Sequence, residues 1–239
     1  MQEGLNITEP IKDKEGPVIA CIGSSEDFGF KESEERRESL GLVNVKNVDQ
    51  ESAIYDGEKE PLTVGPSTYI ISPIDGSNKF SENFYRCTGL IVVGIDKKTG
   101  KNISFLSHQD PLEFLYDYKD KFIDQLKQQL TEIEKRCRQG TVSTVIVGGR
   151  YFSDDELNDR QVIQSYNDSI KLLGTIVEEV LKYEPTVING PKTHKNEKDD
   201  IYFDNKNRRL YFIRPKINFE TGDFASSNVD NQAKTWEEN

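Results

Sequence analysis

FYRCTGLIVVGIDKKTGKNISFLSHQDP, residues 84–111, decides the fold because it contains two strands and the turn between them. Its first part, CTGLIVVGID, is a continuous apolar run of the kind that is buried on both faces of a sheet. DKKTGKN then has the length and the glycine of a hairpin connection, and ISFLS predicts the returning strand. We therefore expect Cys87 at the start of one strand and His108 just past the end of its antiparallel partner, as close neighbours.

Two long amphipathic helices are predicted after this hairpin. Apolar residues at steps of three or four form the stripe of the first helix, which stops before Gly140: Phe122, Leu126, Leu130, Ile133 and Cys137. The stripe of the second helix follows the same spacing: Ile163, Tyr166, Ile170, Leu173, Val177 and Val180. Further strands are predicted at residues 16–23, 67–73, 141–149 and 184–190 and on both sides of the NKN turn in residues 200–213. Residues 74–84 are predicted to be a loop, because Asp75-Gly76 is a turn signal.

This order of elements predicts an α+β fold, in which two long helices pack on a mixed, mostly antiparallel sheet or sandwich. Residues 67–217 form the predicted main domain. Residues 1–66 are predicted to be a partly ordered N-terminal extension with at most one edge strand between residues 45 and 66. Residues 218–239 are predicted to be a polar C-terminal tail.

Composition excludes several classes of partner and of site. The chain has 42 acidic and 31 basic residues, and its net charge of −11 disfavours nucleic acid and anionic membranes as partners. No apolar run is long enough to span a bilayer, and the first residues lack the features of a secretory signal. We expect a cytoplasmic protein, or one that is exported without a classical signal peptide. The three cysteines are an odd number without CxxC spacing, which disfavours a disulfide framework and a cysteine zinc site and predicts free thiols. We expect no metal and no cofactor.

Cys87 and His108 are the candidate catalytic pair. A cysteine hydrolase needs a thiolate and a nearby base, and an imidazole next to the thiol supplies both the activation and a later proton donor. The chain has two histidines, and the second, His194, lies in GPKTHKNEKDD, whose composition predicts an exposed turn. Taken alone, the residues leave two interpretations open. Cys87 and His108 are either a catalytic pair or a buried core thiol next to a solvated loop histidine.

Other residues near this pair are weaker candidates. Ser81 lies six residues before Cys87 in the predicted loop, and its hydroxyl is suited to fix the tautomer of His108. Asp110 and Glu113 are candidates to tune His108 electrostatically. The paired glycines at 148 and 149 either bring backbone close to a substrate or only end a strand. Cys21 and Cys137 lie in apolar patterns and are assigned to the core.

The order of these pieces resembles the CheD-type deamidases. The resemblance is carried by the cysteine that opens a strand, LSHQDP after the next strand, VSTVIVGGR between two long helices, and EPTVING followed by DIYFDNKNRRLYFI. That family includes the chemoreceptor glutamine deamidase, and bacterial toxin deamidases of the cytotoxic necrotizing factor and lethal factor kinds share its fold.

The resemblance implies cysteine-dependent hydrolysis of a glutamine side chain in a protein substrate. It also implies a role as a bacterial toxin or effector, since toxin deamidases share the fold. It assigns the nucleophile to Cys87, the base to His108 and the residue that orients the base to Ser81. Tyr85-Arg86 stands where that family has glycine-serine. A cysteine protease, a transglutaminase and a non-catalytic protein-binding domain of the same fold therefore remain alternatives.

Overall fold

The predicted hairpin is the centre of a five-stranded sheet in the computed structural model, which describes residues 15–24, 46–47, 69–149, 151–152, 160–188, 192–193 and 199–214. β5 (Thr88–Ile95) and β6 (Asn102–Gln109) pair antiparallel along their whole length, and every residue of both strands is buried. The other strands of this sheet are β3 (Tyr69–Ile71), β7 (Ser143–Gly148) and β9 (Thr186–Ile188), in the order β3-β6-β5-β7-β9.

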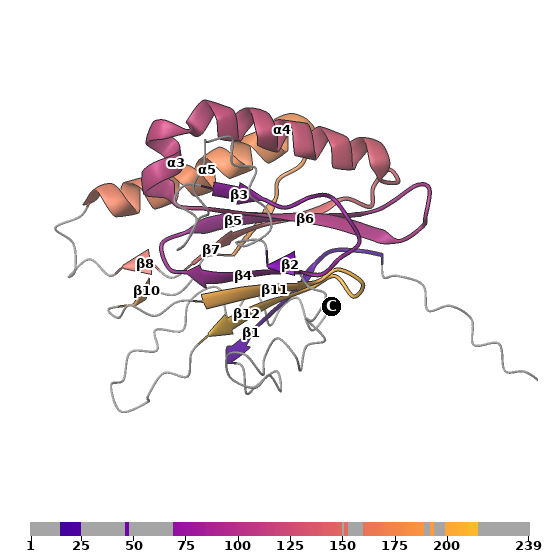
Figure 1. Ribbon diagram of the computed structural model, residues 1–239, viewed down its shortest axis with the longest axis horizontal. Helices are drawn as coiled ribbons and strands as arrows, with labels where there is room; N and C mark the ends of the chain where they lie inside the picture. Colours follow the sequence, from indigo (N-terminus) through magenta and orange to yellow (C-terminus); the bar gives the residue numbers. More distant parts are fainter. Residues whose placement is uncertain are drawn as a thin grey trace, which may run out of the picture.

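A second five-stranded sheet lies below the first in Figure 1. Its order is β1-β12-β11-β4-β2, and its strands are β1 (Ile19–Ser24), β2 (Lys46–Asn47), β4 (Lys79–Phe84), β11 (Asp199–Asp204) and β12 (Arg209–Arg214). β1 runs parallel to β12, whereas β11 runs antiparallel to both of its neighbours. A short parallel pair, β8 (Tyr151–Phe152) with β10 (Lys192–Thr193), lies apart from both sheets.

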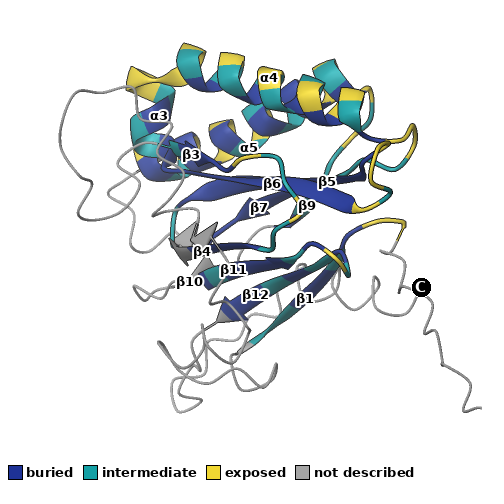
Figure 2. Cartoon of the chain, turned by 45° about the vertical axis from the view of Figure 1, so that its right-hand side comes forward, coloured by how far each residue is buried: buried dark blue, intermediate teal, exposed yellow. Residues whose placement is uncertain are grey.

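Helices cover only the outer face of the first sheet, so the chain forms three layers (Figures 1 and 2). They are α3 (Pro111–Asp117), α4 (Lys119–Arg136) and α5 (Arg160–Leu181). The predicted stripe of α4 is buried under this layer, with Phe122, Leu126, Leu130 and Ile133 in what we call the helix-side core. A second core, the inter-sheet core, fills the space between the two sheets and contains Phe84, Cys87 and Leu106 among others. The α+β class with mixed sheets is therefore confirmed. Among the described helices, none is long and apolar enough to cross a membrane.

Two predicted boundaries were wrong. Residues 79–84 form strand β4, although residues 74–84 were predicted to be a loop. The polar sequence hid this strand, because the buried Lys79 pairs with Asp75 and donates to Ser77 Oγ at 2.9 Å, which lets a charged residue lie inside the fold. β6 continues to Gln109, so His108 lies inside the strand and not past its end.

The N-terminal strand agrees with the prediction, whereas α3 differs from it. β1 corresponds to the strand predicted at residues 16–23, pairs with β12 and contributes Ala20 to the inter-sheet core. α3 was not predicted, because seven residues are too short to show a helical stripe. Asp110 caps this helix by accepting from the Leu112 N–H at 3.0 Å. The predicted edge strand between residues 45 and 66 corresponds to β2, and the C-terminal tail lies outside the described residues.

Arg208 joins distant segments at the end of the sandwich away from α3. Its side chain is buried, and its Nε donates to Asn102 Oδ1 at 3.1 Å. Nη2 donates to the Thr141 carbonyl at 2.9 Å, and Nη1 donates to the Gly16 carbonyl. One guanidinium therefore ties β6, the segment before β7 and the segment before β1 to the β11–β12 turn. Removing it leaves the buried Asn102 oxygen and two partly buried carbonyl groups without these donors.

Replacing Arg208 with methionine keeps most of the side-chain volume and removes these hydrogen bonds. We expect Arg208→Met to lower the free energy of unfolding by about 2–4 kcal/mol, measured by urea denaturation. Lys206→Met in the same turn is the matched control, because Lys206 is exposed, and it is expected to change stability by less than about 0.5 kcal/mol. Equal effects of the two substitutions would show that Arg208 does not hold these segments together.

Candidate active site

A β-bulge in β4 brings two side chains onto the same face of the second sheet. Ile201 of β11 pairs with Ser81, and Asp199 pairs with Phe84, so β4 advances three residues where β11 advances two. In a regular strand, residues three apart point to opposite faces; the extra residue in β4 places Ser81 and Phe84 on one face. Both side chains therefore point into the inter-sheet space, where they meet β6.

The side chains of Ser81 and Phe84 both contact the imidazole of His108. Ser81 Oγ lies 2.8 Å from His108 Nδ1, and both residues are fully buried. The ring of Phe84 stacks on the imidazole, with the ring centroids 3.9 Å apart and an angle of 18° between the planes. When Nδ1 carries the proton and donates it to Ser81, Nε2 keeps the lone pair that a base needs. His108 is therefore a buried and oriented imidazole, and the solvated loop histidine of the alternative interpretation is excluded.

Gly89 makes room for this stack. It is the direct partner of His108 in the β5–β6 ladder. A Cβ atom at Gly89 would lie 2.5 Å from the Ser107 carbonyl oxygen, 2.9 Å from Val147 Cγ2 and 3.1 Å from Phe84 Cε1. Since a side chain at this position collides with backbone as well as with the Phe84 ring, the arrangement depends on glycine.

Cys87 lies on the same face as His108, one step along the ladder. It precedes β5, and strand alternation gives it the same direction as Gly89, the partner of His108, so Cys87 and His108 are diagonal neighbours. Cys87 belongs to the inter-sheet core but keeps 9% of its surface exposed, more than either of the other two cysteines. The predicted hairpin therefore brings the candidate thiol and the candidate base to the same buried corner.

Gly149 holds the segment that leads into Cys87. Its N–H donates to the Cys87 carbonyl at 2.8 Å, and a Cβ there would lie 2.5 Å from the carbonyl oxygen of Tyr85. The Tyr166 hydroxyl of α5 donates to the Gly149 carbonyl at 3.1 Å. The second of the paired glycines thus packs backbone against backbone beside the thiol, and this contact explains why a residue without a side chain is present.

An ion pair closes the rim of the site. Arg86, directly before Cys87, donates from Nε and Nη2 to Asp110 Oδ2 at 3.2 and 3.0 Å. Asp110 Oδ1 accepts from the first turn of α3, so both carboxylate oxygens have partners other than His108. Asp110 therefore anchors the chain on both sides of the site. Burial, and next the charge of Asp110, raise the pKa of Glu113 above its usual range.

Polar side chains on the opposite face of the same strand ends attach the sheet to α5. Thr88 Oγ1 lies 2.5 Å from Ser169 Oγ, and Gln109 Nε2 donates to Thr88 Oγ1 at 3.1 Å. All three residues are fully buried. This cluster fixes the residues next to Cys87 and His108 in the sequence, so both sides of the strand ends are held.

Asp199 is a further buried acid near the site. It is fully buried, and it stands opposite Phe84 on the face that β11 turns toward the inter-sheet core. Neither Phe84 nor Asp199 was predicted from the sequence, because both depend on the β4–β11 pairing between segments more than a hundred residues apart. The only sequence signal for Phe84 is its place three residues after Ser81, and that spacing acquires meaning only through the bulge.

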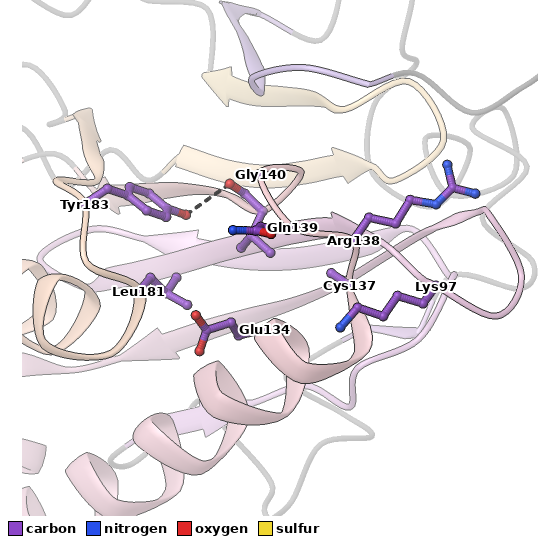
Figure 3. Close-up of a pocket in the computed structure, with 9 residues that line it drawn as sticks. Lys97, Glu134, Cys137, Arg138, Gln139, Gly140, Leu181 and Tyr183 are labelled. Atoms are coloured by element: carbon purple, nitrogen blue, oxygen red, sulfur yellow. Dashed lines mark hydrogen bonds between the residues drawn. The ribbon is translucent and has the colours of Figure 1, made fainter.

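Cys137 is the alternative candidate for a reactive thiol, but its surroundings differ from those of Cys87. It pairs with Asp96 past the far end of β5, about 30 Å from Cys87 along the strand. A surface hollow of about 510 Å³ next to it is lined by Lys97, Glu134, Arg138 and Tyr183 among others (Figure 3). Burial, and next the charge of Asp96, raise the pKa of the Cys137 thiol to about 11. Cys137 is therefore protonated near neutral pH in spite of the hollow.

The predicted candidates divide clearly by their position. Ser81 and His108 are joined by a direct contact, and Cys87 belongs to the same inter-sheet core, at a diagonal ladder position from His108. Cys21 and Cys137 are buried, as predicted. His194 lies outside the described residues. Within the described ranges, no group of three or more histidine, cysteine or acidic side chains is arranged to hold a metal ion.

The sequence matches no known family model, and it has no significant match among curated proteins. The chemistry of the site is therefore inferred from the residues and their geometry.

The substitution Gly89→Ala tests whether the stacking of Phe84 on His108 requires glycine at position 89. We expect Gly89→Ala to lower the free energy of unfolding by about 2–3 kcal/mol, because the added atom overlaps backbone and two side chains. Gly76→Ala is the matched control, since the nearest atom to its added Cβ is 3.5 Å away, and it should change stability by less than about 0.5 kcal/mol. Thermal or urea unfolding of both variants measures the difference, and a Gly89 variant as stable as the control would contradict the packing.

The rate of alkylation by iodoacetamide compares the reactivity of the three cysteine thiols. We expect Cys87 to react first near neutral pH, because it is the most exposed of the three and lies beside His108. Cys137 should react more slowly than Cys87 near neutral pH, because burial and the charge of Asp96 raise the pKa of its thiol to about 11. His108→Ala should slow the modification of Cys87 by about tenfold or more, and Ser81→Ala by a smaller factor. Peptide mapping of the folded protein gives the three rates, and a Cys87 rate that ignores His108 would exclude the pair.

Proposed function

We propose that this protein is a cysteine-dependent deamidase that converts a glutamine side chain of a protein substrate to glutamate and releases ammonia. The observation that carries the proposal is the 2.8 Å contact between Ser81 Oγ and His108 Nδ1, with Cys87 on the same buried face. A histidine that donates from Nδ1 to a hydroxyl carries its lone pair on Nε2, which is the nitrogen that a general base uses. The order of elements that resembles the CheD-type deamidases supports the same assignment.

Each residue of this group has one role in the proposed reaction. His108 takes the thiol proton of Cys87, and the thiolate adds to the carbonyl carbon of the glutamine amide. The carbon–nitrogen bond then breaks as His108 gives its proton to the leaving nitrogen, which departs as ammonia and leaves a thioester. His108 next takes a proton from water, and the resulting hydroxide adds to the thioester carbon. The carbon–sulfur bond breaks, His108 returns its proton to the sulfur and restores the thiol, and the glutamine has become glutamate.

Burial of the site sets the electrostatic conditions for the proposed pair. Ser81, His108 and Phe84 are fully buried, and Cys87 keeps 9% of its surface exposed. A thiolate and an imidazolium attract each other more strongly where water is excluded. Each charge also loses its hydration there, so the pair forms from neutral partners only when neighbouring groups stabilise the imidazolium. Ser81 orients the imidazole, and the Arg86–Asp110 pair keeps the Cys87 segment against the start of α3.

Mass spectrometry of protein mixtures tests the activity without a known substrate. Native bacterial and eukaryotic cell lysates are incubated with the wild-type protein, and peptides are searched for glutamine converted to glutamate. We expect conversion at specific glutamines with the wild type and with Cys137→Ala, a matched cysteine control. We expect none with Cys87→Ala, and a rate lower by about a hundredfold or more with His108→Ala.

Adding methylamine to the same reactions separates the alternative outcomes. A deamidase gives mainly the acid, whereas a transglutaminase gives the methylamide, and a protease gives new peptide ends. Conversion that is equal with wild type and Cys87→Ala, or absent from both lysates while Cys87 is unreactive toward iodoacetamide, would contradict a catalytic role. The latter result would favour a non-catalytic protein-binding domain.

A further inference from the structure

Resting on the function proposed above, we propose that Phe84 is a positioning residue of the site, which holds the imidazole of His108 and supports its positive charge during catalysis. In this proposal Phe84 contacts neither the reacting thiol of Cys87 nor the substrate. It acts through His108, whose ring lies against it at a centroid distance of 3.9 Å.

The first step is the delivery of Phe84 to the imidazole. Residues 81 and 84 reach the same face only because β4 carries one extra residue opposite β11. Bulges of this kind are concentrated next to active sites, where they redirect a side chain. The same bulge therefore supplies both the oxygen at His108 Nδ1 and the ring against the imidazole face.

The second step is the direction of the contact. An angle of 18° between the ring planes makes this a stacked pair, so the imidazole lies over the face of the phenyl ring and not at its edge. The face of an aromatic ring carries negative electrostatic potential, which attracts a cation within about 6 Å of its centroid. A neutral imidazole loses little if the ring is replaced by an aliphatic group of similar size, whereas an imidazolium loses this attraction.

The third step is the absence of water around the ring. His108 is fully buried, and a positive charge there loses its hydration. Ser81 reaches one nitrogen, but it does not cover the ring face. Phe84 covers that face, so its removal is expected to weaken the imidazolium and with it the thiolate of Cys87.

Other charged groups near the site are accounted for separately. Asp199 of β11 stands opposite Phe84, and Arg86 and Asp110 form an ion pair at the rim. These groups remain in a Phe84 variant. A change in the pH dependence of the thiol that appears on replacing Phe84 and requires His108 is therefore assigned to the stacked ring.

The test measures the rate of Cys87 alkylation by iodoacetamide as a function of pH. We expect Phe84→Leu to move the midpoint of this profile upward by about half a unit to one unit, and to slow the reaction near neutral pH by about threefold to tenfold. Phe84→Tyr keeps the ring face and is expected to remain within about twofold of the wild-type rate. Phe84→Met is a second ringless variant of adaptable shape, for use where Phe84→Leu does not fold.

Phe105→Leu is the matched control. Phe105 is a fully buried phenylalanine of β6, but it belongs to the helix-side core on the other face of the sheet from His108. We expect it to lose stability on replacement while the pH midpoint of Cys87 alkylation stays at the wild-type value. A merely structural role of Phe84 would make the two variants behave alike, and that result would overturn the proposal.

His108→Ala and the double variant Phe84→Leu/His108→Ala separate this proposal from the proposed function. If the midpoint does not move in His108→Ala, the Cys87–His108 pair itself is wrong. If it moves in His108→Ala but not in Phe84→Leu, the pair stands and the role of Phe84 is wrong. We expect both single variants to move it, and we expect Phe84→Leu to have no further effect once His108 is absent.

Discussion

The contact between Ser81 on β4 and His108 on β6 joins the two sheets of the sandwich at the end where α3 begins. Two polar groups at this depth need hydrogen-bond partners, and this contact supplies one to each, which favours a fixed separation and register of the sheets at this point. The bulge in β4, the glycine at position 89 and the close approach of Gly149 all serve that geometry. Loss of any one of them displaces a neighbour of the imidazole.

The site combines rigid and adjustable surroundings. On the helix side, Thr88, Gln109 and Ser169 hold the strand ends through buried hydrogen bonds. On the solvent side, Arg86 and Asp110 form a partly exposed ion pair, which is weaker and more sensitive to salt. Cys87 lies between these two environments.

The sequence predicted the parts of the fold that depend on local patterns. The apolar run before Asp96 and the turn at Gly100, which has a φ of +68°, identify the β5–β6 hairpin, and the four-residue steps from Phe122 identify α4. The rest depends on pairing between distant segments. Lys79 and Arg208 are buried charges that composition places on the surface, and the bulge beside Ser81 exists only against β11. The placement of Cys87 and His108 at the ends of one hairpin was therefore within reach of the sequence, whereas the stacked ring of Phe84 and the place of Ser81 in a strand were not.

The most direct measurement of the central claim, that Cys87 and His108 share a proton, is the titration of His108 followed by NMR in wild type and in Cys87→Ala. The chain has only two histidines, so each imidazole signal can be assigned with single variants. A thiolate beside the ring stabilises the imidazolium. The account predicts that His108 becomes protonated at a lower pH when the thiol is removed. A titration curve of His108 that is identical in the two proteins would contradict it.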